Sequence, residues 1–187
     1  MPKLSILIPT LQSRKESFDS LCAFLLKQPL SSEVEILSDV DDGELSVGEK
    51  RNRLLQRATG DFVVFVDDDD KVSDTYVPDV VGVLRLDLDC VGFFGQVFFK
   101  GEFAGRMIHS VLCQSWTEEP GNYYRPPNHL NPIRRDIALT VPFQHIRFSE
   151  DHFWSLGLVE SGLLKHEVFL GHKPMYFYKC GGEKKTL

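Results

Sequence analysis

The chain has 187 residues, of which 42% are hydrophobic and 26% are charged, a balance typical of one globular domain that folds without disulfides or a structural metal. The net charge of −6 at pH 7 gives no basis for a general attraction to nucleic acid or to anionic membranes. The four cysteines are too widely spaced for a cysteine-based metal site, and Cys22 and Cys90 lie among apolar residues, so we expect these two to be reduced core residues.

The N-terminal segment indicates neither secretion nor membrane insertion. Its apolar run after Lys3 has only five residues, which is too short for a signal-peptide core or a membrane span. We therefore expect no membrane span and a cytoplasmic location, which would be the host cytoplasm for a viral protein.

The first half of the chain alternates predicted strands and helices. Strands are predicted at LSILIPT (4–10), VEILSD (34–39) and DFVVFVD (61–67), because each has an apolar run that ends in a breaker or polar residues. Apolar residues recur at helical spacing over about 15–27 and 47–58. This order predicts an α/β fold with a mostly parallel sheet flanked by helices, and such sheets bind ligands at the carboxyl ends of their strands.

Polar residues follow each of these predicted strands. Pro9 and Thr10 lie at the end of the first, Asp39 with Asp41 and Asp42 at the end of the second, and the run Asp67–Asp70 at the end of the third. Four adjacent carboxylates repel one another near a protein wall unless a cation or hydrogen bonds compensate. We expect these three groups to converge and a divalent metal to bind at the aspartate run.

The second half has a different character. Residues 90–103 are rich in aromatics and glycine and predict strands or a hairpin. The proline-rich segment 120–132 predicts an ordered surface loop over the crevice. Helical segments are expected near 132–139 and 150–161, and a last strand over 174–179 precedes a polar tail.

In order along the chain, SILIPT, EILSDVDDG, VGEKRNRLLQRATGDFVVFVDDDD and FSEDHFWS resemble family 2 glycosyltransferases, which have the nucleotide-sugar-binding GT-A fold. The glycine-ended helix carrying KRN and the strand running into DDDD are the specific part of this resemblance. It implies one GT-A domain over 1–187, with a nucleotide-binding half at 1–89 and an acceptor-side half at 90–187. The implied activity is metal-dependent, inverting sugar transfer from a nucleoside-diphosphate sugar to a glycan or other hydroxyl acceptor.

The same resemblance implies the residues that hold the nucleotide. Pro9 and Thr10 would line the nucleoside pocket, and Asp39 would accept a hydrogen bond from the base, which favours uracil and hence a UDP-sugar. Lys50 and Arg51, just inside the second helix, would face the nucleotide as cations. A charge run on a helix also often forms only a solvated face.

The aspartate run resembles the Asp-X-Asp element of the family. We place this element at Asp67 and Asp69, with Asp69 as a ligand of Mn²⁺ or Mg²⁺, and treat Asp68 and Asp70 as supporting residues. Asp68 would help to bind the nucleotide. His172 lies where some GT-A enzymes have a late metal-binding histidine, so we include it among the candidate ligands.

The pair Glu150 and Asp151 resembles the catalytic acidic pair of the family, in which the second residue is the general base for the acceptor hydroxyl. Acids at the start of a helix also serve merely as caps. His129 has no assigned role. A sugar-stacking platform is possible among four aromatic residues between which no spacing rule selects, namely Trp116, Tyr123, Tyr124 and Trp154.

Two other functions stay open at this point. Asp68, Asp70 and Val72 fit the D-X-D-X-V pattern of haloacid-dehalogenase-like phosphatases, although two strand-helix units precede it here. A non-catalytic module that binds nucleotide sugars or glycans would keep the same fold without turnover. The sequence names neither the sugar nor the acceptor.

Overall fold

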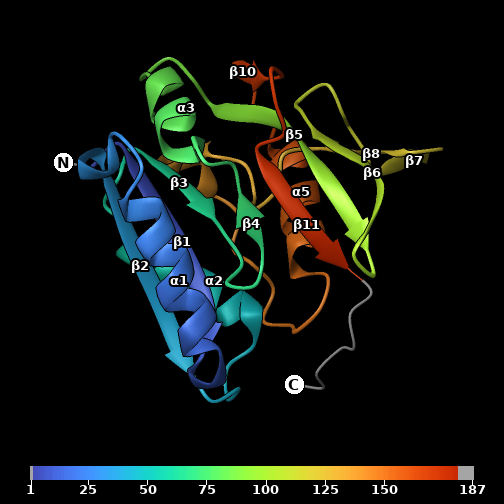
Figure 1. The fold of residues 1–187 in the computed structure, drawn as a ribbon. Helices are drawn as coiled ribbons and strands as arrows, with labels where there is room; N and C mark the ends of the chain where they lie inside the picture. Colours follow the sequence, from blue (N-terminus) through green and yellow to red (C-terminus); the bar gives the residue numbers. More distant parts are fainter. Residues whose placement is uncertain (1, 181–187) are drawn as a thin grey trace.

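A central β-sheet runs through the protein and helices pack on both of its faces (Figure 1). The structure is a computed structural model that describes residues 2–180, so the polar tail lies outside the described residues. The helices are α1 (Lys15–Leu26), α2 (Val47–Arg57), α3 (Tyr76–Val83), α4 (Arg135–Ala138) and α5 (Glu150–Ser161), with short 3-10 turns at Gln12–Arg14 and Ser31–Glu33.

The strands follow the order β2-β1-β3-β9-β5-β6-β8-β7 across the sheet. Those of the first half are β1 (Leu4–Leu11), β2 (Val34–Asp41), β3 (Phe62–Phe65) and β4 (Lys71–Val72). Those of the second half are β5 (Cys90–Phe99), β6 (Glu102–His109), β7 (Thr117–Glu119), β8 (Asn122–Arg125), β9 (Ile133–Arg134), β10 (Glu167–Leu170) and β11 (Tyr176–Cys180).

The first strands form the parallel part of this sheet. β1 pairs in parallel with β2 and β3, and β10 and β11 pair in parallel with β5, whereas β6 and β9 run antiparallel to β5. The expected α/β fold with a mostly parallel central sheet is confirmed. The carboxyl ends of β1, β2 and β3 therefore meet at one edge.

Alternation along β1 divides the apolar interior into two cores. Leu4, Ile6 and Ile8 belong to the core under α1 and α3, while Leu7 faces the core under α2, α4 and α5. A strand buried on both faces reads as a continuous apolar run, which is why LSILIPT was recognisable in the sequence.

The segment expected to be a surface loop is mostly internal. After β8, residues 126–131 are buried, and side-chain amides supply the hydrogen bonds that their backbone needs. Asn131 Oδ1 accepts from the backbone N–H of Asn128, and Asn128 Oδ1 accepts from that of Leu130. The helix expected over 132–139 is also shorter, because Ile133 and Arg134 form β9.

Within residues 2–180, no helix combines the length and apolar character needed to cross a bilayer. The four cysteines are free thiols; Cys90 is buried, and Cys22 is half-buried against the first core.

Candidate active site

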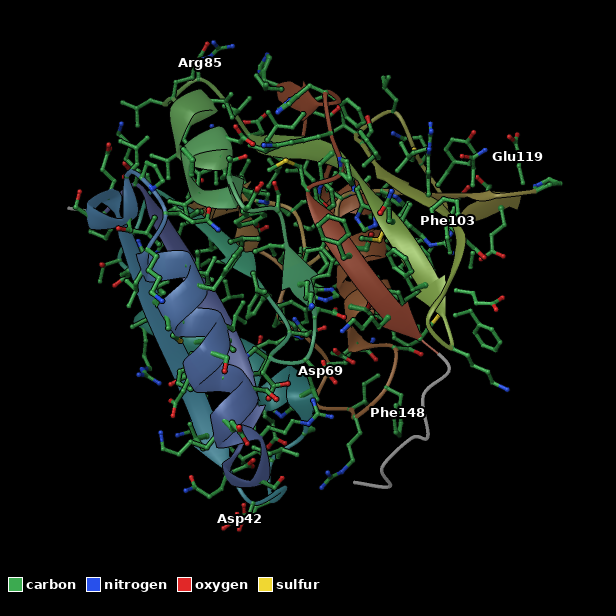
Figure 2. All side chains as sticks on the ribbon, viewed as in Figure 1. Asp42, Asp69, Arg85, Phe103, Glu119 and Phe148 are labelled. Carbon is green, nitrogen blue, oxygen red and sulfur yellow. The ribbon has the colours of Figure 1, made fainter. Side chains whose placement is uncertain are left out.

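A cavity of about 810 Å³ opens at the carboxyl ends of β1 and β3 and is closed on its other side by the start of α5. Its wall on the first-half side includes Pro9, Thr10, Lys50 and Arg51 together with residues 67–69. Figure 2 labels two of the lining residues, Asp69 at the aspartate run and Phe148 in the segment that leads into α5. Most of the predicted site residues therefore converge on one cavity.

A capping box fixes the start of α2. The hydroxyl of Ser46 accepts a hydrogen bond from the N–H of Glu49, and the Glu49 carboxylate accepts one from the N–H of Ser46. The first helical turn is therefore held in place, and the next residues, Lys50 and Arg51, are buried. Lys50 donates to the carbonyl oxygen of Thr10 (2.7 Å) and forms an ion pair with Asp41.

Arg51 joins two distant carboxylates. Its Nη2 lies 3.1 Å from Asp67 Oδ1 and its Nε lies 3.2 Å from Glu150 Oε1, while its side chain is only 4% exposed. The guanidinium also lies over the ring of Phe65, 5.0 Å from the centroid. The end of β3 and the start of α5 are thereby tied together across the cavity.

The first two aspartates of the run are held by partners from the protein. Burial alone would raise the pKa of Asp67, but the guanidinium charge of Arg51 keeps that pKa well below its usual range. Asp68 is buried, accepts from the Thr10 hydroxyl (2.5 Å) and accepts from Arg14 Nη1 (2.8 Å). Arg14 lines the cavity as well, and no pattern in the sequence pointed to it.

The last two aspartates differ sharply. The Asp69 side chain is 58% exposed, and its Oδ2 lies 3.1 Å from Arg14 Nη1. Partial desolvation of the carboxylate and the charges of Asp68 and Asp67 raise the pKa of Asp69 despite that arginine. Asp70 does not line the cavity; it accepts from the Tyr176 hydroxyl (2.9 Å). Burial, with the Asp67 charge, raises the pKa of Asp70 to about 8.

This set of oxygens fits a divalent cation that is held in part by a substrate. Asp67 and Asp69 both line the cavity, and the Asp69 side chain is more than half exposed there beside Arg14. No cluster of three His, Cys, Asp or Glu residues suited to a metal exists in the described part of the chain. Mg²⁺ and Mn²⁺ sites of this kind typically use one or two carboxylates and take further ligands from phosphate and water.

His129 lies between the aspartate run and Asp151. Its Nε2 is 3.6 Å from Asp67 Oδ2 and its Nδ1 is 3.6 Å from Asp151 Oδ2. Both distances exceed a hydrogen bond, and neither ring nitrogen has a hydrogen-bond partner among residues 2–180. Glu150 and Asp151 both line the cavity; the Asp151 side chain is 26% exposed, and the Glu150 side chain is buried against Arg51.

Two predicted residues are not brought to the cavity. Asp39 is buried and forms an ion pair with Arg53 Nε (3.1 Å), and it is not among the lining residues. Strand β2 continues two residues further than expected, so Asp41 is the residue that holds Lys50 and the backbone N–H of Leu45 at the cavity wall. The sequence did not show where β2 ends, so Asp39 was chosen instead of Asp41.

His172 also lies elsewhere. Its Nε2 is 3.6 Å from Asp79 Oδ2 on α3, and it does not line the cavity. The turn before β11 directs it toward that helix, where Asp79 also pairs with Lys173. A metal site built on Asp67 and Asp69 therefore has no support from His172.

Solved structures of glycosyltransferases share this fold. Residues 1–349 of S. aureus TarS in complex with UDP-GlcNAc give a TM-score of 0.71 at 16% identity, covering 97% of this chain and 60% of that one. The mannosyltransferase PcManGT from Pyrobaculum calidifontis with GDP-Man and Mn²⁺ gives 0.61 at 11% identity, covering 98% and 58%. These neighbours show that the chain has the GT-A fold.

A third neighbour is glucosyl-3-phosphoglycerate synthase from Mycobacterium tuberculosis in complex with Mn²⁺, UDP and glucosyl-3-phosphoglycerate, with a TM-score of 0.51 at 17% identity over 97% of this chain and 73% of that one. No curated protein sequence is matched. The sequence model described as "Glycosyl transferase family 2" matches residues 41–154, which include the capped helix, the aspartate run and the start of α5. The chain belongs to glycosyl transferase family 2.

Proposed function

We propose that this chain transfers a sugar from a nucleoside-diphosphate sugar, a UDP-sugar in the first instance, to a hydroxyl acceptor with inversion at the anomeric carbon. One observation carries the proposal. A single cavity has the carboxylates of Asp67 and Asp69 on one side and the separate, partly exposed carboxylate of Asp151 on the other. This arrangement suits a donor diphosphate held at the first pair and an acceptor hydroxyl at the second.

The donor would lie along the wall formed by Pro9 and Thr10. Neighbours of the same fold bind UDP-GlcNAc, or GDP-Man with Mn²⁺, which supports a nucleotide sugar and a divalent cation as ligands here. Asp69, the most exposed aspartate of the run, is the best placed to ligate Mn²⁺ or Mg²⁺, with Asp67 beside it. When bound, the cation would supply charge neutralisation of the leaving nucleoside diphosphate.

Lys50, Arg51 and Asp68 would act on the donor indirectly. All three are buried and already engaged with protein partners, so they hold the wall and the carboxylates in place. We do not assign Asp39 to the base contact, because its carboxylate pairs with Arg53 and does not line the cavity. The role of reading the base thus passes to groups on the cavity wall near Asp41.

Asp151 would be the general base. The acceptor oxygen forms a bond to the anomeric carbon, the bond from that carbon to the diphosphate oxygen breaks, and the hydroxyl proton passes to the Asp151 carboxylate. Attack from the face opposite the leaving group inverts the configuration. Glu150 would position this helix end through Arg51 rather than contact the acceptor. In this proposal residues 1–89 bind the donor and residues 90–187 contribute the acceptor side.

Calorimetry with UDP, with and without MnCl₂, tests the donor half of the proposal. UDP should bind in the presence of Mn²⁺ and lose most of its affinity in EDTA or in Asp69→Asn. Asp74→Asn, an acidic residue outside the cavity lining, is the matched control and should bind UDP as the wild type does. Equal UDP affinity with EDTA and with Mn²⁺ would remove the metal assignment.

The two alternatives make different predictions. A phosphatase of the D-X-D-X-V type needs Asp68 and Asp70 in one cleft, but Asp70 lies against Tyr176, outside the cavity. A non-catalytic module would bind UDP-sugars without either transfer or slow hydrolysis. Release of UDP from UDP-GlcNAc by the wild type, and its loss in Asp151→Asn, separates the enzyme from the module.

A further inference from the structure

The cavity has a third group of lining residues, which neither the donor side nor the base accounts for. Trp116, Tyr123 and Arg125 come from β8 and the approach to β7, and His152 comes from the first turn of α5. β7 and β8 lie at the end of the sheet opposite β2 (Figure 1). They therefore bring side chains to the cavity from the half of the chain that carries Asp151.

The indole of Trp116 is held in a fixed position. The guanidinium of Arg125 lies over its ring at 4.5 Å from the centroid, and Arg125 is itself fixed by the Glu118 carboxylate (2.6 Å) and the carbonyl oxygen of Thr117 (3.0 Å). This contact is a cation–π interaction, which is stronger with the indole of tryptophan than with the ring of tyrosine or phenylalanine. Trp116 is therefore presented to the cavity as a rigid surface that loses little conformational freedom when a ligand packs on it.

The structure also distinguishes Trp116 from the other aromatic candidates. Trp154 is buried, stacks on Phe143 at 4.5 Å and donates its indole N–H to the carbonyl oxygen of Val141. Tyr124 does not line the cavity, because alternation along β8 points it away from Tyr123, which does. Of the four aromatic candidates, Trp116 and Tyr123 are the two that line the cavity.

Trp116 lies beside the proposed base. Its ring meets the ring of His152 edge to face at 4.7 Å, and His152 directly follows Asp151 in α5. We propose that Trp116, supported by Arg125 and flanked by Tyr123 and His152, forms an acceptor subsite that packs against the apolar face of a neutral pyranose ring. This inference rests on the proposed function.

The charges of this wall favour a neutral sugar. Arg125 is neutralised by Glu118, and Asp151 adds a negative charge nearby. Arg147 also lines the cavity, but its Nη2 donates to the carbonyl oxygen of Gly43 (2.8 Å), which lies on the donor side. Among the cations of residues 2–180, a phosphate or carboxylate on the acceptor would meet none at Trp116 that lacks a compensating partner. A pyranose, with C–H groups on one face of its ring, matches an aromatic surface.

Intrinsic fluorescence tests this subsite directly, because the chain contains two tryptophans and Trp154 is buried. The protein is saturated with UDP and MnCl₂ and titrated with methyl glucopyranosides, methyl galactopyranosides and methyl N-acetylglucosaminides, with ribitol as an open-chain control. At least one pyranoside should change the emission saturably, and ribitol should not. The response should vanish in Trp116→Leu and persist in Tyr124→Leu, which removes an aromatic ring of the same strand outside the cavity.

Trp116→Phe distinguishes loss of the subsite from loss of the fold. Saturation-transfer NMR should detect the same pyranoside bound to Trp116→Phe, roughly three- to tenfold more weakly, since a smaller ring remains. UDP affinity, measured in parallel, should be unchanged in every variant. If UDP binds with Mn²⁺ but no pyranoside responds, or if Trp116→Leu binds it like the wild type, the subsite is refuted while the donor site stands. Failure to bind UDP at all would refute the proposed function instead.

Discussion

The buried guanidinium of Arg51 pairs with two carboxylates that lie far apart in the sequence, those of Asp67 and Glu150. Asp67 and Glu150 depend on its guanidinium, since each lies within 3.2 Å of one of its nitrogens. Replacing all members of a buried ion pair by apolar residues often changes stability little. Removing only one member is costly, because the remaining charges are left desolvated and without a partner. Among single residues, Arg51 is therefore a position where substitution should be costly.

Replacing Arg51 by Met should therefore lower the free energy of unfolding by about 3 kcal/mol, because the buried carboxylate of Glu150 and the partly buried carboxylate of Asp67 lose their cation. Urea denaturation followed by circular dichroism measures this loss. Lys15→Met is the matched control: its ion pair with Asp19 is exposed on α1 and should cost at most about 0.5 kcal/mol. Similar losses in both variants would contradict the role assigned to Arg51.

Asp151→Asn should lower turnover by roughly 10² to 10⁴, because the amide keeps the size of the side chain but cannot accept the acceptor proton. UDP affinity should be unchanged, since the base acts in the transition state. Steady-state transfer kinetics, or donor hydrolysis in the absence of an acceptor, measures the effect. A residue that only stabilised the helix dipole would be replaced at a cost of about 0.3–1 kcal/mol in stability with turnover preserved.

Residue types at strand ends predicted the cavity well, but not every member of it. Thr10 and Asp67 could be predicted from the sequence, because a breaker or an acidic residue after an apolar run marks the carboxyl end of a strand. Asp39 was expected at the end of its strand, but β2 continues two residues further to Asp41, so Asp39 lies within the strand and pairs with Arg53 instead of lining the cavity. His129 had no local pattern, since its position depends on a buried loop held by two asparagines.

At the scale of elements, the N-terminus of α2 determines where two buried cations lie. The capping box of Ser46 and Glu49 satisfies backbone N–H groups that the helix itself leaves unpaired. Lys50 and Arg51 follow within the next turn, so the cap sets both the start of the helix and the placement of its charges.

Ser46→Ala should lower the free energy of unfolding by about 1 kcal/mol, because the hydroxyl that accepts from the Glu49 N–H is lost. Thermal denaturation of the variant beside Ser46→Gly measures the cap, since glycine at this position should cost only a few tenths of a kcal/mol. Equal losses in the two variants would mean that the hydroxyl contributes through contacts other than capping.

The predicted elements of the first half match the structure closely because they depend on local periodicity. Helices 15–27 and 47–58 were expected, and α1 and α2 occupy Lys15–Leu26 and Val47–Arg57. The second half was harder: the expected last strand over 174–179 is β11 (Tyr176–Cys180), but β9 was missed, because it is defined by pairing with distant strands rather than by its own pattern. The proline-rich segment 120–132 was predicted to be a surface loop, because the side-chain hydrogen bonds that hold its buried part cannot be seen in the sequence.

At the scale of the whole molecule, His109 makes stability depend on pH. Burial lowers its pKa to about 4, although the hydrogen bond between its Nδ1 and Asn131 Oδ1 (3.0 Å) opposes the shift. The unfolded chain takes up this proton near pH 6.5 and the folded chain only near pH 4. The unfolded state thus binds more protons in that window, so stability is full above about pH 6.5 and falls as the pH is lowered toward 4.

His109→Phe should flatten this dependence, because phenylalanine keeps a ring against Phe93 but cannot bind a proton. The wild type should lose up to about 1.4 kcal/mol per pH unit more than the variant between pH 6.5 and 4. Urea denaturation across this range measures both profiles. Parallel profiles for the two proteins would show that another group controls the loss.

The contact between Arg51 and Glu150 spans 99 positions of the sequence, and it sets a requirement on the order of assembly. During synthesis the first half of the chain leaves the ribosome with strands β1 to β3 complete, but with its buried guanidinium lacking one of its two carboxylates. Closing so long a loop has an entropic cost that local helix formation does not have. A chain that ends before Glu150 therefore lacks the second carboxylate partner of Arg51, and it also lacks β10 and β11, which pair with β5 in the sheet.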